Sequence, residues 1–344
     1  MGRSLEAFAA YHRKKETLVD YLQVASAGLA LLRRNLDVPN APTLLGSLVD
    51  ACGIKHWAEG KHYNNALEKV DASISALADL GIIQQVAAFD VFSRSLIQDV
   101  TRFSSQARQR FAPLGHDHHL LKLSPAHRWV SAHCCNDVVG RLNSLSSRLD
   151  ELQVWIGWSP SGRLSPTLVL FDLIRSVRNR IAHDDGIVGS DLEELSGSRE
   201  IANALGAFRR EYARADFPAL PKFKRGRPLN LSTVHSILFG AFLYEIAKEM
   251  NAYAVSLLND DEFIDMAFYY SCLIDEHPFR TLRHRSVENR VRYFLASRYY
   301  RKENAPSIDA VRRRLTTQQV QSNGRASTTL WRIALARHEE ILLE

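Results

Sequence analysis

An arginine and a histidine five residues apart are the side chains of this sequence best suited to chemistry. Arg178 and His183 open and close the segment RNRIAH. The arginine guanidinium keeps its positive charge and matches the non-bridging oxygens of a phosphate. The histidine imidazole takes up and releases a proton near neutral pH. The pair therefore predicts acid/base chemistry on a phosphodiester, a mechanism that does not require a metal ion.

The two residues lie near the end of residues 164–186, a segment with the pattern of an amphipathic helix. Ser165 can act as the N-cap, and Pro166 suits the first helical position, where no N–H is needed. Gly186 follows the last periodic residue and can take the left-handed conformation that ends many helices. The apolar stripe expected to face a core consists of Leu170, Ile174, Val177 and Ile181.

The spacing of Arg178 and His183 limits how they can act together. On an ideal α-helix five residues turn the chain by about 140°, so the two side chains cannot share one face. Either the last turn loosens and swings His183 back, or two copies of the helix meet across a cleft and bring the arginine and histidine of both chains together.

Residues 178–183 resemble the Arg-x4-His motif, in its Arg-Asn-x-x-Ala-His form, of the HEPN superfamily (higher eukaryotes and prokaryotes nucleotide-binding). Its members are all-helical domains, many of them metal-independent endoribonucleases of toxin–antitoxin and antiphage systems. They typically dimerise so that the two motifs face each other. The resemblance covers about residues 75–256. It implies that Arg178, Asn179 and His183 are catalytic, in a homodimer that cleaves RNA without a cofactor.

Further basic residues surround the motif and are candidates for contact with RNA phosphates. Arg175 lies before the motif on the same helix and Arg180 lies within it, and a solvated arginine is the simpler interpretation of both. A proline-bounded loop, residues 218–228 (PALPKFKRGRP), is called the basic loop below. It is either a solvated loop or an edge that grips phosphates beside the cleft. Its four cations are Lys222, Lys224, Arg225 and Arg227.

The net charge of +6 is concentrated near the C-terminus. Residues 278–315 hold eleven Lys or Arg and three acidic residues, a local net charge of +8, and the remaining 33 basic and 35 acidic residues leave −2. Arg290 and Arg292 belong to this segment, where arginines alternate with aromatic residues. That mixture can grip a nucleic-acid backbone and stack on bases. It can equally be a helical bundle with an aromatic core and solvated arginines.

The histidines and cysteines do not predict a metal site. The run His116–His119, together with His127 and the adjacent His133, Cys134 and Cys135, lacks the paired spacing of zinc ligands. The four cysteines show no disulfide framework, which favours a reducing, cytoplasmic location. The N-terminus does not resemble a signal peptide, and no apolar run approaches the ~18 residues of a membrane span.

Helical periodicity along the chain, without alternating strand patterns, predicts an all-α protein. We expect an N-terminal helical segment (1–70), a HEPN-like helical bundle (71–256) and a basic, aromatic-rich helical segment (257–344). Long helices are expected over 4–36, 65–111 with an interruption near Gly81, 126–156, 191–213 and 231–258.

Three functions fit these features. The first is a metal-independent endoribonuclease that acts as a toxin or antiphage effector, with RNA as substrate, a homodimeric site and an antitoxin or regulatory partner. The second is a non-catalytic RNA-binding or adaptor protein with the same fold. The third is a helical DNA-binding regulator that reads DNA with its C-terminal segment. Cleavage of RNA in EDTA separates the first two, and DNA against RNA affinity separates the third.

Overall fold

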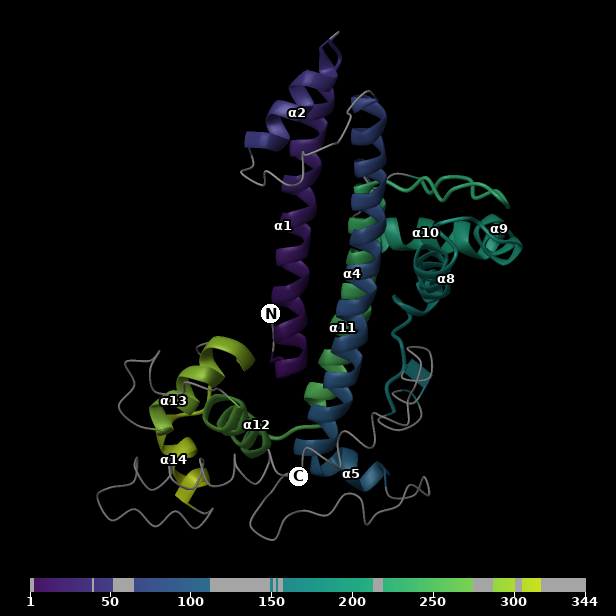
Figure 1. The fold of residues 1–344 in the computed structure, drawn as a ribbon. Helices are drawn as coiled ribbons and strands as arrows, with labels where there is room; N and C mark the ends of the chain where they lie inside the picture. Colours follow the sequence, from purple (N-terminus) through teal and green to yellow (C-terminus); the bar gives the residue numbers. More distant parts are fainter. Residues whose placement is uncertain are drawn as a thin grey trace. The chain divides into compact units, whose positions relative to one another are not determined.

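The described residues of this computed structural model form an all-α fold, as the periodicity predicts (Figure 1). They are residues 3–38, 40–51, 65–111, 149–150, 153, 157–212, 219–274, 287–300 and 305–316. Within these ranges the β-type pairing is a single isolated bridge between Ile187 and Pro228. The helix expected at 126–156 lies almost entirely outside them.

The chain divides into two compact units, each assembled from separate stretches of sequence. Unit 1 comprises residues 1–12, 90–159 and 247–344, and unit 2 comprises residues 13–89 and 160–246. Three long helices contribute residues to both units: α1 (Glu6–Asn35), α4 (Ala66–Phe103) and α11 (Thr233–Ser256). The three-part division at residues 70 and 256 rests on composition and stays a prediction.

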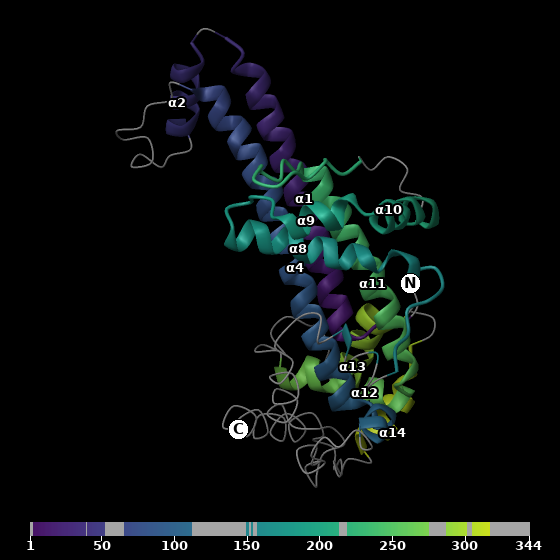
Figure 2. The ribbon, with the colours of Figure 1, turned by 90° about the vertical axis from the view of Figure 1, so that its right-hand side faces the viewer.

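In unit 2, α4 and α11 pack closely because glycines lie at their contact, and Figures 1 and 2 both show the two helices side by side. A Cβ atom on Gly81 would lie 2.4 Å from the Ser236 hydroxyl, and one on Gly240 would lie 2.4 Å from Gln85. The expected interruption near Gly81 is wrong, because α4 is continuous to Phe103. Gly81 serves the approach of α11 instead of breaking its own helix.

The rest of unit 2 is built on these helices. The core includes Leu18, Leu22 and Leu77, which pack together from α1 and α4. Beyond them, α2 (Ala41–Ala51) closes a second apolar cluster with the end of α1. The remaining elements are the 3-10 turn η3 (Ser165–Thr167), α8 (Val169–His183), α9 (Ser190–Gly197) and α10 (Arg199–Glu211).

Aromatic rings attach α8 and α10 to this core. Phe171 of α8 lies 6.0 Å from Phe89 of α4 between ring centroids, and Phe208 of α10 lies 5.4 Å from Phe242 of α11. The expected helix at 191–213 is two helices, since Ser198 has extended backbone and caps α10 by accepting from the Ile201 N–H. Each helix that carries a candidate site residue in this unit is thus fixed by buried contacts.

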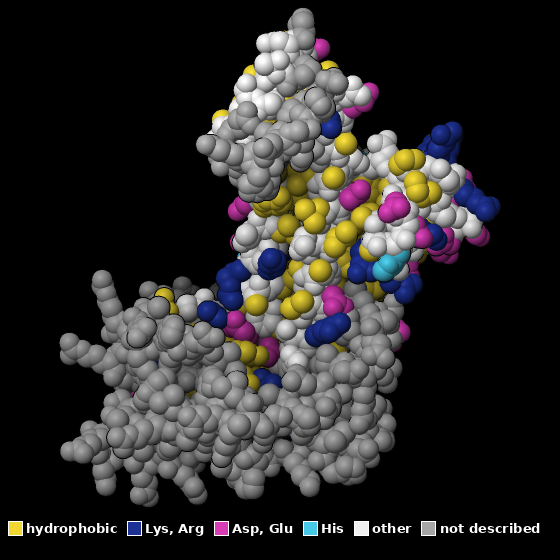
Figure 3. All heavy atoms as spheres, viewed as in Figure 1, with side chains coloured by type: hydrophobic (Ala, Val, Ile, Leu, Met, Phe, Trp, Pro, Cys, Tyr) yellow, Lys and Arg dark blue, Asp and Glu magenta, His cyan; other side chains and the backbone are white. Residues whose placement is uncertain are grey.

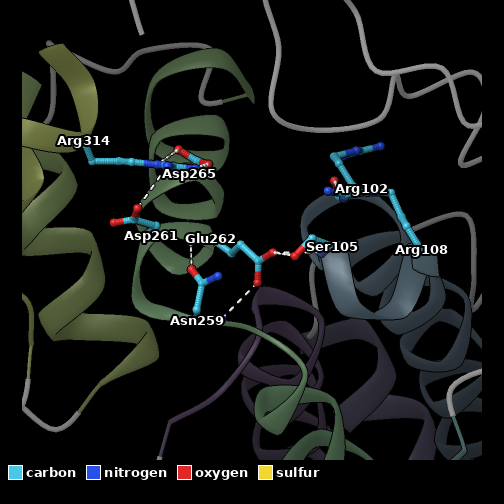
Figure 4. A network of polar contacts seen from close by, with 8 residues as sticks. All are labelled: Arg102, Ser105, Arg108, Asn259, Asp261, Glu262, Asp265 and Arg314. Atoms are coloured by element: carbon cyan, nitrogen blue, oxygen red, sulfur yellow. Dashed lines mark hydrogen bonds and ion pairs between the residues drawn. The ribbon is translucent and has the colours of Figure 1, made fainter. Parts of the chain in front are cut away.

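Polar contacts join the elements of unit 1, and Figure 4 shows the main network. Glu262 of α12 (Asp260–Phe268) accepts from the N–H and hydroxyl of Ser105 at the start of α5 (Ser105–Phe111), at 2.8 and 2.6 Å. Arg314 of α14 (Ile308–Thr316) pairs with Asp265, and with Asp261 at 3.0 Å. The π-helical turns η4 (Tyr269–Ile274) and η5 (Leu295–Tyr299) and the helix α13 (Val287–Phe294) complete the unit.

The start of α1 in unit 1 is capped by side chains from distant helices. The Leu5 N–H donates to Asn251 at 2.9 Å, and the Ala7 N–H donates to Asp99 at 3.0 Å. These bonds satisfy N–H groups that the first helical turn leaves without a partner. Asp99 is fully buried and also accepts from the Tyr270 hydroxyl at 2.5 Å. Burial outweighs these bonds and raises the pKa of Asp99 to about 6.

One helix in the described part of the chain, α4, has the length and apolar composition of a membrane span. The same test selects core helices of water-soluble proteins. Within the two units α4 buries the side chains of Ile82, Phe89 and Phe92, and it also carries the buried carboxyl group of Asp99.

Candidate functional site

The motif helix α8 begins later than the sequence predicts. Residues Ser165–Thr167 form η3, whose N-cap is Leu164, and Pro166 takes an early position in that turn. Ser165 is therefore not the cap of α8, which begins at Val169 without a side-chain cap. Leu170, Ile174 and Val177 are buried as expected, and the fourth residue of the stripe, Ile181, is half-buried.

The end of α8 tests the first arrangement of the motif, in which the last helical turn loosens. The helix stays α-helical through His183, and the N–H of the C-cap Asp184 donates to the Arg180 carbonyl at 3.0 Å. The chain then turns away, with positive φ at Asp185 (50°) and at Gly186 (72°), as expected for the glycine. The last turn is therefore not loosened, and His183 does not swing back toward Arg178 of the same chain.

The motif residues take different positions around α8. Asn179 and His183 are exposed, whereas Arg178 is half-buried at the side of the helix. The Arg178 guanidinium donates to the Asn179 side-chain oxygen at 3.1 Å. This bond joins a half-buried guanidinium to an exposed side chain. Asn179 therefore acts as a link between Arg178 and the surface on which His183 lies.

Arg175, Asn179 and His183 follow one another at spacings of four residues, so they form one exposed row along α8. Arg175 is exposed and pairs with Asp172 at 3.3 Å, one turn back on the same helix. An exposed pair of this kind is weak and can open for a competing anion. The row presents a cation, an amide and an imidazole to solvent.

Arg180, expected to contact RNA, is half-buried and pairs with two carboxylates of its own unit. Its guanidinium donates to Asp184 at 2.8 Å and also pairs with Asp191 at the start of α9. Gly189 makes room for these contacts, since a Cβ atom there would lie 2.5 Å from the guanidinium. Arg180 thus positions α9 against the end of α8, and its charge is already matched by two carboxylates.

The basic loop is bound directly to the chain that leaves α8. The Val188 N–H donates to the Arg227 carbonyl and the Gly226 N–H donates to the Val188 carbonyl, each at 2.9 Å. The Leu229 N–H donates to the Gly186 carbonyl at 3.0 Å. These bonds surround the Ile187–Pro228 bridge. The loop therefore lies beside the helix end that carries His183, within one unit.

The cations of the basic loop all point to solvent. Lys222, Lys224, Arg225 and Arg227 are exposed, while Phe223 between them is buried. A turn closes the tip, with the Arg227 N–H donating to the Lys224 carbonyl at 3.0 Å and Gly226 at a φ of 72°. In Figure 3, lysine and arginine side chains gather over this extended segment beside α9 and α10.

A buried histidine fixes the other end of the loop. His235 of α11 has its Nε2 atom 3.1 Å from the Ala219 carbonyl, and its Nδ1 atom accepts from the Ser232 N–H at 3.1 Å. These partners assign the ring proton to Nε2. The loop is therefore held at both ends, at Ala219 by α11 and at Arg227 by the segment after α8.

The two basic residues expected to bind RNA from unit 1 differ in accessibility. Arg290 is 1% exposed, and its Nε donates to the Ser271 carbonyl at 2.6 Å. A guanidinium buried to this degree cannot contact a phosphate from solvent, so Arg290 is not a candidate RNA contact. Arg292 is exposed, next to Tyr293, which is 48% exposed. Much of the basic C-terminal segment, residues 275–286, 301–304 and 317–344, lies outside the described residues.

The structure does not describe the histidines and cysteines considered above as metal ligands. The histidine run 116–119 and residues His127, His133, Cys134 and Cys135 lie outside the described ranges. Among the residues that the structure describes, no three His, Cys, Asp or Glu side chains are grouped as metal ligands.

The sequence analysis did not identify three residues that organise the site. Asp191 holds Arg180, Gly189 admits that contact, and Val188 binds the basic loop through its backbone. Only Asp191 had a signal in the sequence, as an acidic residue in the first turn of an expected helix.

Comparisons with protein-family models, with curated proteins and with solved structures found no match to this chain.

Proposed function

We propose that this chain is a metal-independent endoribonuclease whose active site forms between two copies of α8. The observation that carries the proposal is the end of α8. It presents His183 to solvent on a regular helix, and the segment that follows it binds a basic loop with four exposed cations. The resemblance of residues 178–183 to the HEPN motif supports the same chemistry and the role of a toxin or antiphage effector in the cytoplasm.

The reaction proposed for this site uses the nucleophile of RNA itself. One His183 accepts the proton of the 2′-OH as its oxygen attacks the phosphorus, and the second His183 donates a proton to the leaving 5′-oxygen. Arg178 of each chain stabilises the charge on the non-bridging oxygens, with Asn179 orienting the guanidinium. The products carry a 2′,3′-cyclic phosphate and a 5′-OH.

The basic loop supplies binding rather than chemistry in this proposal. Lys222, Lys224, Arg225 and Arg227 attract the phosphates on one side of the motif, and Arg175 extends the cationic row along α8. Arg180 positions α9 and does not contact the substrate. Arg292 is the exposed candidate from unit 1.

The test is cleavage of RNA by the purified chain in excess EDTA, with the new ends identified by mass spectrometry. The expected result is unchanged cleavage in EDTA, cyclic phosphate ends, and intact DNA of the same sequence. Loss of cutting in EDTA or equal cutting of DNA contradicts the mechanism. RNA binding without cleavage supports an adaptor, and tighter binding of DNA supports a DNA-binding regulator. Sequencing of RNA ends after brief expression, against His183→Ala, identifies the RNA that is cut.

A further inference from the structure

A cavity of about 590 Å³ lies between α9, α10 and the start of the basic loop. This volume is within the range of small-ligand sites. The lining is mostly apolar, with lysines from the basic loop among its polar members. The apolar lining residues are Ile201, Ala202, Leu205, Ala219, Leu220, Pro221 and Phe223.

We propose that this cavity binds an unpaired base of the RNA, and that the substrate is therefore single-stranded or looped RNA. The inference rests on the proposed function and deepens it, because it assigns a substrate class to the same site. The base would lie against Leu205 and Leu220, with the adjoining phosphates on Lys222 and Lys224, which both line the cavity and are exposed.

The chemistry of the lining favours a nucleotide. A base offers a flat apolar face and is attached to a phosphate, so it needs an apolar wall beside cations. The cavity has such a wall, and among the described residues that line it Glu193 is the one acidic side chain. A base in a duplex has both faces covered by its neighbours and cannot enter, whereas a base in a single strand can.

The position of the cavity connects it to the motif. Lys222 and Lys224 line the cavity, and Gly226 and Arg227 of the same loop bind Val188, five residues beyond His183. A strand with one base in the cavity could therefore run along the cations of the loop toward the end of α8. An acidic, partly apolar peptide has similar chemistry, but four exposed cations within six residues match a phosphate backbone better.

The experiment measures binding without cleavage. A fluorescent single-stranded 2′-O-methyl oligonucleotide lacks the nucleophile and is titrated with the full chain by anisotropy. An abasic oligonucleotide of equal length keeps the phosphates and removes the bases. The variant Ala202→Trp fills the cavity from an exposed position that lines it, and Asn203→Trp adds the same side chain at the exposed neighbour outside the lining.

Ala202→Trp should weaken binding of the intact oligonucleotide about tenfold, the effect of losing one stacked base, and leave the abasic one unchanged. Asn203→Trp should change neither, and a duplex should bind like the abasic strand. Equal affinity for intact and abasic strands, or equal weakening of both by Ala202→Trp, overturns the proposal. An acidic peptide that binds the wild-type chain and not the Ala202→Trp variant would then identify the other ligand class. No step of this experiment involves cleavage, so the two proposals can fail separately. If Ala202→Trp weakens binding tenfold but the wild-type chain does not cut RNA in EDTA, the nuclease is refuted and the base site stands.

Discussion

Val188 and Gly226 are joined by a hydrogen bond of 2.9 Å from the Gly226 N–H to the Val188 carbonyl, and this contact places the basic loop beside the motif helix. Val188 follows the end of α8 by five residues, and Gly226 lies between Arg225 and Arg227. Because the contact joins backbone groups, it leaves the cations of the loop free to face solvent. The geometry of Gly226 therefore decides where those charges lie.

Gly226→Val should weaken RNA binding while leaving the fold intact. Gly226 has a φ of 72°, a conformation that costs a β-branched residue about 1–2 kcal/mol and that asparagine tolerates. The valine variant should shift the loop and weaken affinity for single-stranded RNA several-fold, while the strain lowers the thermal unfolding midpoint by no more than a few degrees. Gly226→Asn is the matched control and should bind like the wild type. Equal losses in both variants would mean that the backbone conformation is not the cause.

Arg178→Ala and His183→Ala should each lower RNA cleavage by about 10²-fold or more, since each removes charge stabilisation or proton transfer. His183 is exposed, so its loss should leave the unfolding midpoint unchanged. Cleavage rates and circular dichroism melts of the purified variants provide the measurement. A folded His183→Ala chain that cuts RNA at the wild-type rate would mean that His183 has no role in cleavage. A His183→Ala chain with a clearly lowered unfolding midpoint would mean that His183 is structural.

The all-α fold and the buried face of α8 could be predicted because helical periodicity is a local property. Leu170, Ile174 and Val177 are buried where their spacing places them. The role of Gly81 could not be predicted, since the Ser236 hydroxyl that requires it comes from a helix far along the chain. A lone glycine in a helical pattern looks the same whether it breaks the helix or admits a neighbour.

The candidate site was predictable in composition and not in arrangement. The types and spacing of Arg178, Asn179 and His183 are visible in the sequence, and so are the cations of the basic loop. The loop reaches α8 through backbone bonds at Val188, which any residue except proline could make, so the sequence holds no sign of them. The ion pair of Arg180 could not be predicted, because its partner Asp191 lies across a turn whose course the sequence does not specify.

Arg314→Met should destabilise unit 1 by about 3 kcal/mol, because the Asp265 side chain is 4% exposed and would lose its cationic partner. Arg312→Met is the matched control on the same helix, where the pair with Asp309 is exposed and contributes less than about 1 kcal/mol. Urea unfolding followed by circular dichroism measures both. Adding Asp265→Asn should restore part of the loss, and no recovery in the double variant would assign the effect to packing of the arginine stem.

The stability of unit 1 should fall as pH rises from about 4 to about 6. Burial raises the pKa of Asp99 to about 6, so the folded state binds this proton more tightly than the unfolded chain does. The resulting stabilisation is present below pH 4 and lost as pH rises through 6, a change of about 3 kcal/mol. Asp99→Asn mimics the protonated acid and should flatten this dependence in urea titrations at pH 4, 5 and 6. An unchanged slope in the variant would assign the dependence to other carboxyl groups.

The shared site predicts how wild-type and inactive chains behave when mixed. Because α8 is regular through His183, Arg178 and His183 of one chain face about 140° apart, and a two-fold contact brings both pairs into one cleft. Wild-type chains are therefore co-refolded with His183→Ala chains in varying proportion, and RNA cleavage is measured at constant total chain. If the cleft needs both histidines, a mixed dimer is inactive, so equal mixing should leave about a quarter of the activity. Activity that stays proportional to the wild-type fraction would contradict the shared cleft, as would a chain that sediments as a monomer at its full cleavage rate.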